Sequence, residues 1–343
     1  MVRRHRRHGT ALGKAVRGRS PILANSPPGR KYERFATSSI DDQAGKPLAM
    51  ILLTGATGVV GSALLQRLLQ EGEEVRCLVR DPRRLGPNRV RVQITLGDLA
   101  NPVSLRQAVR GARAVVHLAA AIRDQRDATI EELNGLATAR LLRYAASAGV
   151  ERFVYFGALG ATPSSRTRFF RAKALAERAV ADAGIDTVVL SPSIVYDPGD
   201  PFMSLLRRLS LLPWMPISGS GGSAYQPMWA QDAAQCALQA LRRGAAGAER
   251  RLELAGPELL TYEEIVRLAL AAWDRPRPLI HVPLWAVRWS LRVIERLAGA
   301  SAFATWEEAE LMEVPMTTPR GTEDAGRLGV EPRPMEQVLG LAA

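Results

Sequence analysis

Three regularly spaced glycines offer the clearest chemistry in this chain. Gly55, Gly58 and Gly61 lie in the segment Thr54-Gly-Ala-Thr-Gly-Val-Val-Gly61, between an apolar run and a stretch of helical periodicity. The first permits a tight turn, the second lets the backbone approach an anion, and the third lets the helix pack close to a strand. Free N–H groups at a helix start favour negative charge. We therefore expect a pyrophosphate at this turn, contacted by Thr54, Gly55, Thr57, Gly58, Val59, Val60 and Gly61.

The end of the next apolar segment distinguishes two dinucleotides. An acidic residue there binds the ribose 2′-hydroxyl of NAD, whereas an arginine accommodates the 2′-phosphate of NADP. Arg80 lies 25 positions after Gly55, close to the usual interval of about 20. Arg83 and Arg84 follow, and a solvated face explains them equally well. The arginines favour NADP(H) over NAD(H), and Asp81 keeps NAD as the alternative.

Two later segments end with residues that suit the same nucleotide. In Gly97-Asp98-Leu99, the carboxylate of Asp98 either accepts a hydrogen bond from the adenine amino group or caps the helix that begins near Asn101. We place Leu99 with it in the cofactor site. In His117-Leu-Ala-Ala120, small side chains such as Ala119 leave room for a cofactor to cross the sheet.

The elements that must position these residues alternate between strand and helix. Apolar strand patterns cover 50–54, 74–80, 90–96, 114–119, 152–156 and 187–190, and helical periodicity covers 58–71, 129–148 and 169–183. Such alternation predicts an α/β fold with a doubly wound parallel sheet. Its ligand crevice lies at the carboxyl ends of the strands.

The chain changes in character after about residue 192, where prolines and glycines become frequent and all six tryptophans lie. We expect a nucleotide-binding core over 50–192 and a small, mostly helical cap over 193–343, interleaved with the last elements of the sheet. Helical patterns at 230–243 and 284–298, a strand at 251–254 and a capping box at Thr261–Glu264 support this division.

Composition excludes several classes of protein. The 343 residues are 47% hydrophobic and 23% charged, as in globular proteins. Two cysteines, Cys77 and Cys236, exclude a disulfide scaffold, and the four histidines lack metal-ligand spacing. No apolar run reaches the roughly 18 residues of a membrane-spanning helix, and no apolar segment follows the N-terminal arginines as in a signal peptide. A cytoplasmic location is expected.

The net charge of +12 is concentrated at the N-terminus, since residues 1–49 carry eleven basic and three acidic side chains. We expect a disordered basic leader, either a nucleic-acid arm, a transit peptide or sequence upstream of a misassigned start. Met50, directly before the first strand, favours the last. The remainder is only mildly basic, so nucleic acid is not expected as a partner.

Together these motifs resemble atypical members of the short-chain dehydrogenase/reductase superfamily, over about residues 50–280, and the resemblance implies a Rossmann fold. The matching segments are Thr54–Gly61, Gly97–Leu99, His117–Ala120, Val150–Phe156 and Leu190–Tyr196. Within the superfamily, Leu254–Glu264 is similar to the nucleotide-binding accessory subunit of respiratory complex I. The resemblance also places Pro192 beside the cofactor.

In enzymes of this superfamily, a Tyr-x-x-x-Lys pair and a serine carry the chemistry. The resemblance assigns the lysine role, which is to hold the nicotinamide ribose, to Lys173. Residues 50–343 contain 34 arginines and this single lysine. The tyrosine position is Phe169, and Phe156–Leu159, where the serine is expected, has no hydroxyl. Losing a general acid costs about 10²–10⁴ in rate.

Other groups near the predicted crevice offer weaker candidates. Tyr196 follows the sixth strand and is a candidate substitute for the missing acid. Tyr155 is expected in the core. Asn134, on the long helix, has a structural or proton-relay role in the family, and helix packing or surface exposure explains it equally well.

The apolar segment Phe202–Pro216 suits a lipophilic ligand. The helix at 284–298 has Trp285 and Trp289 beside Arg288, Arg292 and Arg296, a pattern compatible with peripheral contact with a membrane interface, although packing of the tryptophans on the domain is the alternative.

Two functions follow from this sequence. The first is an NADP(H)-dependent oxidoreductase that acts on a lipophilic, quinone- or isoprenoid-like substrate with a non-standard proton donor. The second is a non-catalytic NADPH-binding module in the assembly or sensing of a respiratory or quinone-biosynthetic complex. A sugar-nucleotide epimerase or dehydratase is a further alternative.

Overall fold

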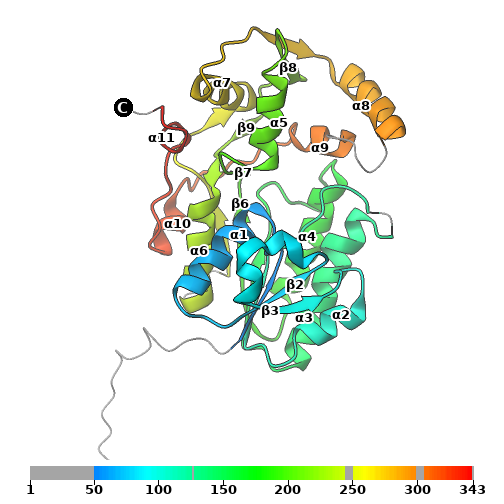
Figure 1. Ribbon diagram of the computed structural model, residues 1–343, viewed down its shortest axis with the longest axis vertical. Helices are drawn as coiled ribbons and strands as arrows, with labels where there is room; N and C mark the ends of the chain where they lie inside the picture. Colours follow the sequence, from blue (N-terminus) through cyan, green and yellow to red (C-terminus); the bar gives the residue numbers. More distant parts are fainter. Residues whose placement is uncertain (1–49, 126, 244–249, 299–304, 342–343) are drawn as a thin grey trace, which may run out of the picture. The chain divides into compact units, whose positions relative to one another are not determined.

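A parallel sheet forms the centre of the computed structural model, which describes residues 50–125, 127–243, 250–298 and 305–341. In these ranges the sheet has seven strands in the order β11-β6-β5-β4-β1-β2-β3, and each neighbouring pair is parallel (Figure 1). The strands are β1 (Ile51–Thr54), β2 (Val75–Val79), β3 (Gln93–Leu96), β4 (Ala114–His117), β5 (Arg152–Phe156), β6 (Asp186–Pro192) and β11 (Arg251–Leu254). The predicted doubly wound α/β fold is confirmed.

Helices cover both faces of this sheet. One face packs against α1 (Val59–Gln70) and α6 (Ala230–Arg243), and the other against α2 (Pro102–Ala108), α3 (Ala137–Ser147) and α4 (Arg168–Ala181). Successive residues of β1 alternate between the two cores: Leu53 belongs to the first and Leu52 to the second. A strand buried on both sides needs apolar residues on both faces, as β1 has from Ile51 to Leu53 before the buried Thr54.

Two predicted elements differ from those observed. The third strand begins at Gln93 rather than Val90, because Pro82–Val90 forms 3₁₀ turns (η1) that contain Pro87. The single helix expected over 129–148 is a π-helical turn, η2 (Glu132–Leu136), followed by α3.

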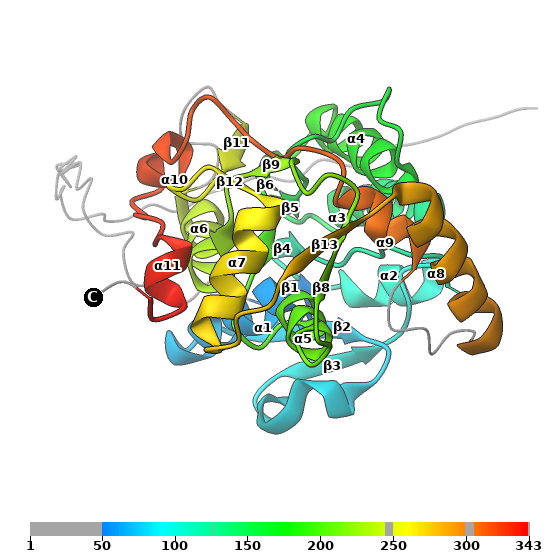
Figure 2. The ribbon, with the colours of Figure 1, turned by 90° about the horizontal axis from the view of Figure 1, so that it is seen from above.

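Part of the C-terminal region joins the central sheet and its helices, and the rest lies above the sheet. β11 pairs with β6, α6 packs against α1, and α10 (Glu323–Arg327) contacts β11. The remaining elements lie above the sheet (Figures 1 and 2), and all but α8 contribute described residues to a third core. They are α5 (Pro201–Leu209), α7 (Tyr262–Ala272), α8 (Leu284–Ala298), α9 (Trp306–Leu311), α11 (Met335–Val338) and the strand pairs β7 (Val195–Tyr196) with β10 (Met228–Trp229), β8 (Met215–Ser218) with β13 (Leu279–Val282), and β9 (Ala224–Tyr225) with β12 (Leu260–Thr261).

Local signals in this region agree with the structure. The predicted capping box is formed: the Thr261 side chain accepts from the Glu264 N–H, and the Glu264 carboxylate accepts from the Thr261 N–H. The apolar segment after residue 201 forms α5 and β8, whose buried residues enter the third core. The predicted basic leader, residues 1–49, lies outside the described residues.

Candidate functional site

The glycine turn has the tight geometry that its sequence predicts. Gly55 has a φ of +77°, and a Cβ there would lie 2.6 Å from the Ala119 nitrogen of the chain leaving β4. A Cβ at Gly61 would lie 2.0 Å from the Gly55 carbonyl oxygen. Helix α1 can therefore approach the turn only because both positions lack a side chain.

The start of α1 fits an anion. In the described part of the chain, its N-cap Gly58 is exposed and no side chain caps it, and the first turn contains no acidic residue. Thr57, Val59 and Val60 are partly exposed beside it. The Gly58 N–H donates to the Gly55 carbonyl oxygen at 2.9 Å, so the N–H groups available to a pyrophosphate are those of the first residues of α1.

An open cleft of about 940 Å³ lies beside the carboxyl ends of β2 and β3. Arg80 and Arg84 line it together with Asp98, Asn101, Arg123 and Gln125. Arg84, for which a solvated face was an equal explanation, thus shares the cleft with Arg80. Two guanidinium groups on one wall suit a phosphate monoester.

The acidic residues near the cleft are partly engaged. The Asp81 carboxylate accepts from the Arg83 N–H at 2.9 Å and so caps η1. Asp98 accepts from the Ala100 N–H at 2.9 Å, and its other oxygen lies 3.8 Å from the Arg80 guanidinium. Asn101, rather than Asp98, caps α2.

Lys173 is buried on α4, with its Nζ donating to the Phe156 carbonyl oxygen at 2.6 Å. The same nitrogen lies 4.9 Å from the centre of the Tyr155 ring and 5.7 Å from that of Phe169. Burial lowers the pKa of Lys173 to about 8, and the charge of Glu177 opposes that shift. The lysine thus lies at the end of β5, beside the ring that replaces the tyrosine.

The space beside the end of β5 is occupied by a carboxylate. A Cβ at Gly157 would lie 2.1 Å from Glu177 Oε1. This oxygen accepts from the Ala158 N–H at 3.2 Å and the Ser191 hydroxyl at 3.3 Å, and Arg251 pairs with the other carboxylate oxygen at 3.3 Å. The missing hydroxyl therefore reflects a different packing of this corner.

The remaining predicted residues lie at the same edge of the sheet. Leu99 packs against the second core, and Ala119 contacts the glycine turn. Pro192 is buried at the end of β6, where its carbonyl oxygen accepts from the Leu159 N–H at 2.9 Å. Their contacts with a cofactor stay predictions.

Neither tyrosine is exposed to solvent. Tyr155 and Tyr196 are each 1% exposed, and their hydroxyls find no partner among the described residues. Burial raises the pKa of both phenols. Tyr155 packs in the second core as expected, and Tyr196 packs in the third. The role of Tyr196 as proton donor stays a prediction.

The sequence offered no spacing signal for three other groups. His117 is fully buried between two threonines. Arg168 forms a paired ionic clamp with Asp124 and Glu131. Burial raises the pKa of Glu313. This residue lies on the segment that crosses the ends of β5 and β6, where a Cβ at Gly160 would lie 3.3 Å from the Pro315 carbonyl oxygen.

Comparison with known proteins agrees with this site. Residues 55–205 match a family model described as NAD(P)H-binding. The chain is 30% identical over 258 residues to sterol demethylase protein B of Methylococcus capsulatus, covering 68% of this chain and 77% of the relative. It is 28% identical over 239 residues to subunit 9 of the NADH dehydrogenase [ubiquinone] 1 alpha subcomplex of Arabidopsis thaliana, covering 64% of this chain but only 58% of that relative.

A solved structure supports the fold. An epimerase of Methanothermobacter thermautotrophicus superposes with a TM-score of 0.67 at 19% identity, over 87% of this chain and 91% of the epimerase chain. With the sequence relatives, the glycine turn and the seven-stranded sheet of the described ranges, the chain belongs to the NAD(P)H-binding, Rossmann-fold short-chain dehydrogenase/reductase superfamily.

Proposed function

We propose that this protein binds NADP(H) and acts as an oxidoreductase on a lipophilic substrate of quinone or isoprenoid type. The observation that supports the choice of nucleotide is that Arg80 and Arg84 both line the cleft. Asp81, the acid that would favour NAD, caps a turn with its carboxylate. The start of α1 would hold the pyrophosphate, and Lys173 would hold the nicotinamide ribose.

The nicotinamide would supply or accept a hydride. The chain's own residues would bind and orient the nicotinamide and the substrate, and they would exclude water. The proton would have to come from a group other than Phe169. Tyr196 is one candidate, and Glu313 is the other, with a pKa that burial raises and a carboxylate that lies against Gly219, directly after β8. The name of the Methylococcus relative, a sterol demethylase protein, supports a lipophilic substrate.

The second candidate is a non-catalytic NADPH-binding module of a membrane complex. It is favoured by Phe169 and by Glu177, which fills the corner at Gly157 where a hydroxyl is expected. The relative named as a subunit of NADH dehydrogenase points the same way.

One experiment separates the two candidates. NADPH and NADH titrations on the wild type and Arg80→Asp come first, followed by single-turnover oxidation of bound NADPH with a panel of quinones and ketones. Equal losses of both nucleotides in Arg80→Asp would refute the 2′-phosphate assignment. Tight NADPH binding without any hydride transfer would overturn the oxidoreductase and leave the binding module. Phe169→Tyr tests whether the acid alone is missing, with a gain of about 10² in ketone reduction expected if so.

Contact with a membrane surface is also part of this proposal. Among the helices in the described ranges, none is long and apolar enough to cross a bilayer. On α8, Trp285 and Trp289 are 76% and 70% exposed, one helical turn apart, and Leu291 is buried against the cap. Arg292 and Arg296 are exposed on the same helix, which packs against α9. Exposed tryptophans beside arginines suit the interface of an anionic bilayer.

A further inference from the structure

The described residues 121–125 and 127–131, here called the cleft loop, lie between β4 and η2 and line one part of the cleft. Asp124, Gln125 and Ala128 line the cleft from this loop. The Gln125 N–H donates to the Ala128 carbonyl oxygen at 2.9 Å, which makes a short antiparallel bridge. The loop therefore has a defined shape, and its position relative to the cleft depends on what anchors it.

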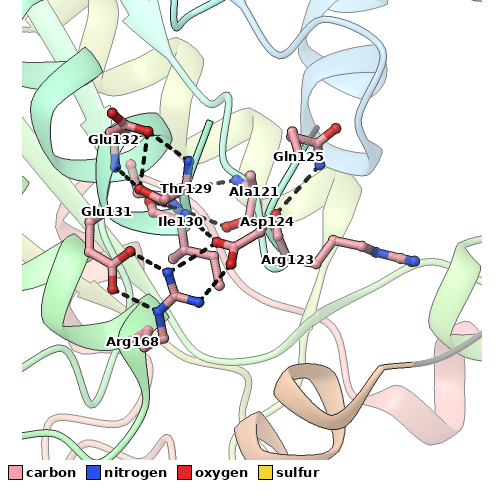
Figure 3. Close-up of polar contacts among 10 residues, drawn as sticks. Ala121, Arg123, Asp124, Gln125, Thr129, Ile130, Glu131, Glu132 and Arg168 are labelled. Atoms are coloured by element: carbon pink, nitrogen blue, oxygen red, sulfur yellow. Dashed lines mark hydrogen bonds and ion pairs between the residues drawn. The ribbon is translucent and has the colours of Figure 1, made fainter. Parts of the chain in front are cut away.

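Arg168 is the anchor on the side of α4. Its guanidinium donates to Asp124 at 2.8 and 3.1 Å and to Glu131 at 2.8 and 2.6 Å, so that each carboxylate is held by two bonds (Figure 3). Hydrogen bonds from Arg168 lower the pKa of both Asp124 and Glu131, so both carboxylates stay ionised at neutral pH. The fork geometry of a guanidinium matches this double pairing, which an ammonium cannot reproduce.

The anchored loop meets the nucleotide cleft at its other side. Gln125 Oε1 accepts from the Arg80 guanidinium at 3.1 Å. Arg80 also lies 3.8 Å from Asp98, and its side chain is 59% exposed, so these two contacts direct an otherwise mobile arginine. At the base of the loop, buried Asn134 accepts from the Ala121 N–H at 3.0 Å and donates to the Ala121 carbonyl oxygen at 2.7 Å.

The same clamp is tied to the helix of the lysine. Arg168 is the first residue of α4, one position before Phe169 and five before Lys173. A third contact joins the loop to the cap, where Arg123 pairs with Glu308 of α9 at 2.9 Å. The cleft loop therefore lies between the arginine at one end of the proposed nucleotide site and the helix that carries Lys173 at the other.

From this arrangement the geometry points to Arg168 as a positioning residue for NADP(H): it holds the cleft loop so that Gln125 directs Arg80 toward the 2′-phosphate. This inference rests on the proposed NADP(H) binding. It predicts that Arg168 sets the preference for NADPH over NADH although Arg168 is not among the residues that line the cleft. A merely structural role would weaken both nucleotides equally.

The test is a measurement of the dissociation constants of NADPH and NADH for the full chain. Arg168→Ala is expected to reduce the NADPH-to-NADH preference by about fivefold or more, a common size for coupling between sites. Arg168→Lys is expected to fail to restore it. Gln125→Ala should give a similar loss, and the double variant should lose no more than either single one. Arg178→Ala, an exposed arginine on the same helix, is the matched control.

Thermal unfolding of each variant accompanies the titrations. If Arg168→Ala does not fold, Asp124→Asn removes one half of the clamp with a smaller change. An unchanged preference in a folded clamp variant, with Arg80→Asp still losing NADPH, overturns the inference and leaves the proposed nucleotide intact. A wild type that shows no preference for NADPH overturns both.

Discussion

The Nδ1 of His117 lies 2.6 Å from the Thr54 hydroxyl, at the point where β1 and β4 run side by side. Its Nε2 lies 2.9 Å from the Thr138 hydroxyl of α3. Burial, and secondarily the charge of Lys173, lower the pKa of His117 to about 3. The imidazole is therefore neutral in the folded protein and joins two strands and a helix through hydroxyl groups.

This histidine predicts sensitivity to acid. An unfolded histidine binds a proton below about pH 6.5, whereas the folded one stays neutral down to about pH 3, so stability falls as the pH falls between these values. The expected contribution is about 1.4 kcal/mol per pH unit. Denaturant unfolding at pH 7, 6 and 5 measures it. His117→Gln should be less stable at pH 7 and have a shallower slope; equal slopes would contradict the assignment.

The close packing of the glycine turn predicts that alanine costs much more stability at Gly61 than at an exposed glycine elsewhere. Gly61→Ala would place a Cβ 2.0 Å from the rigid Gly55 carbonyl, and overpacking of this kind costs about 1–3 kcal/mol or more. The free energy of unfolding should fall accordingly, and NADPH binding should weaken because α1 is displaced. Gly184→Ala is the control, since a Cβ there meets nothing within 4 Å. Its stability should stay within about 0.5 kcal/mol of wild type; similar losses in both variants would refute the close-packing argument.

Lys173 predicts the pH dependence of nucleotide binding. With its pKa lowered to about 8, the ammonium loses its proton as the pH rises through that value. If the charged form binds the nucleotide, the NADPH dissociation constant should rise about tenfold between pH 7 and pH 9. Fluorescence titrations across this range measure the effect. Lys173→Met should bind more weakly at pH 7 and show no such rise; the same rise in that variant would exclude Lys173 as its source.

The tryptophans of α8 predict lipid selectivity. Vesicles with anionic lipid should bind the wild type, and binding should fall with added salt because the arginines are exposed. Trp285→Ala with Trp289→Ala should reduce binding at least about tenfold. Trp273→Ala, which removes a tryptophan packed against the third core, controls for the loss of a tryptophan outside α8. Undiminished binding of the double variant would assign this face to a protein partner or to solvent.

The sequence predicted most of the sheet because buried parallel strands leave a strong local pattern. The strands at 152–156 and 251–254 and the helices at 230–243 and 284–298 match the observed elements residue for residue. The strand expected over 90–96 is shorter because η1 occupies its start. The short strand pairs of the cap have no pattern of their own, since each forms only through contacts with a distant segment.

The residues of the candidate site likewise divide into those that a local sequence pattern reveals and those that it does not. Gly55 and Gly61 were predictable because each allows a backbone conformation or a close approach between backbone segments within one local turn. The clamp of Arg168 was not, because its partners lie 37 and 44 positions away and no periodicity connects them. The engagement of Asp81 as a cap was likewise invisible, since the same residue pattern suits a ribose ligand.

The Glu177 carboxylate at the end of β5 also limits how a serine could be introduced at this corner. A side chain at Gly157 would displace Glu177 from the Ala158 N–H, from Ser191 and from its pairing with Arg251. A hydroxyl-bearing side chain at this corner therefore requires the Glu177 carboxylate to turn away and give up these contacts. A library that aims at a serine at position 157 should therefore vary residue 177 with it, because the two side chains compete for the same space.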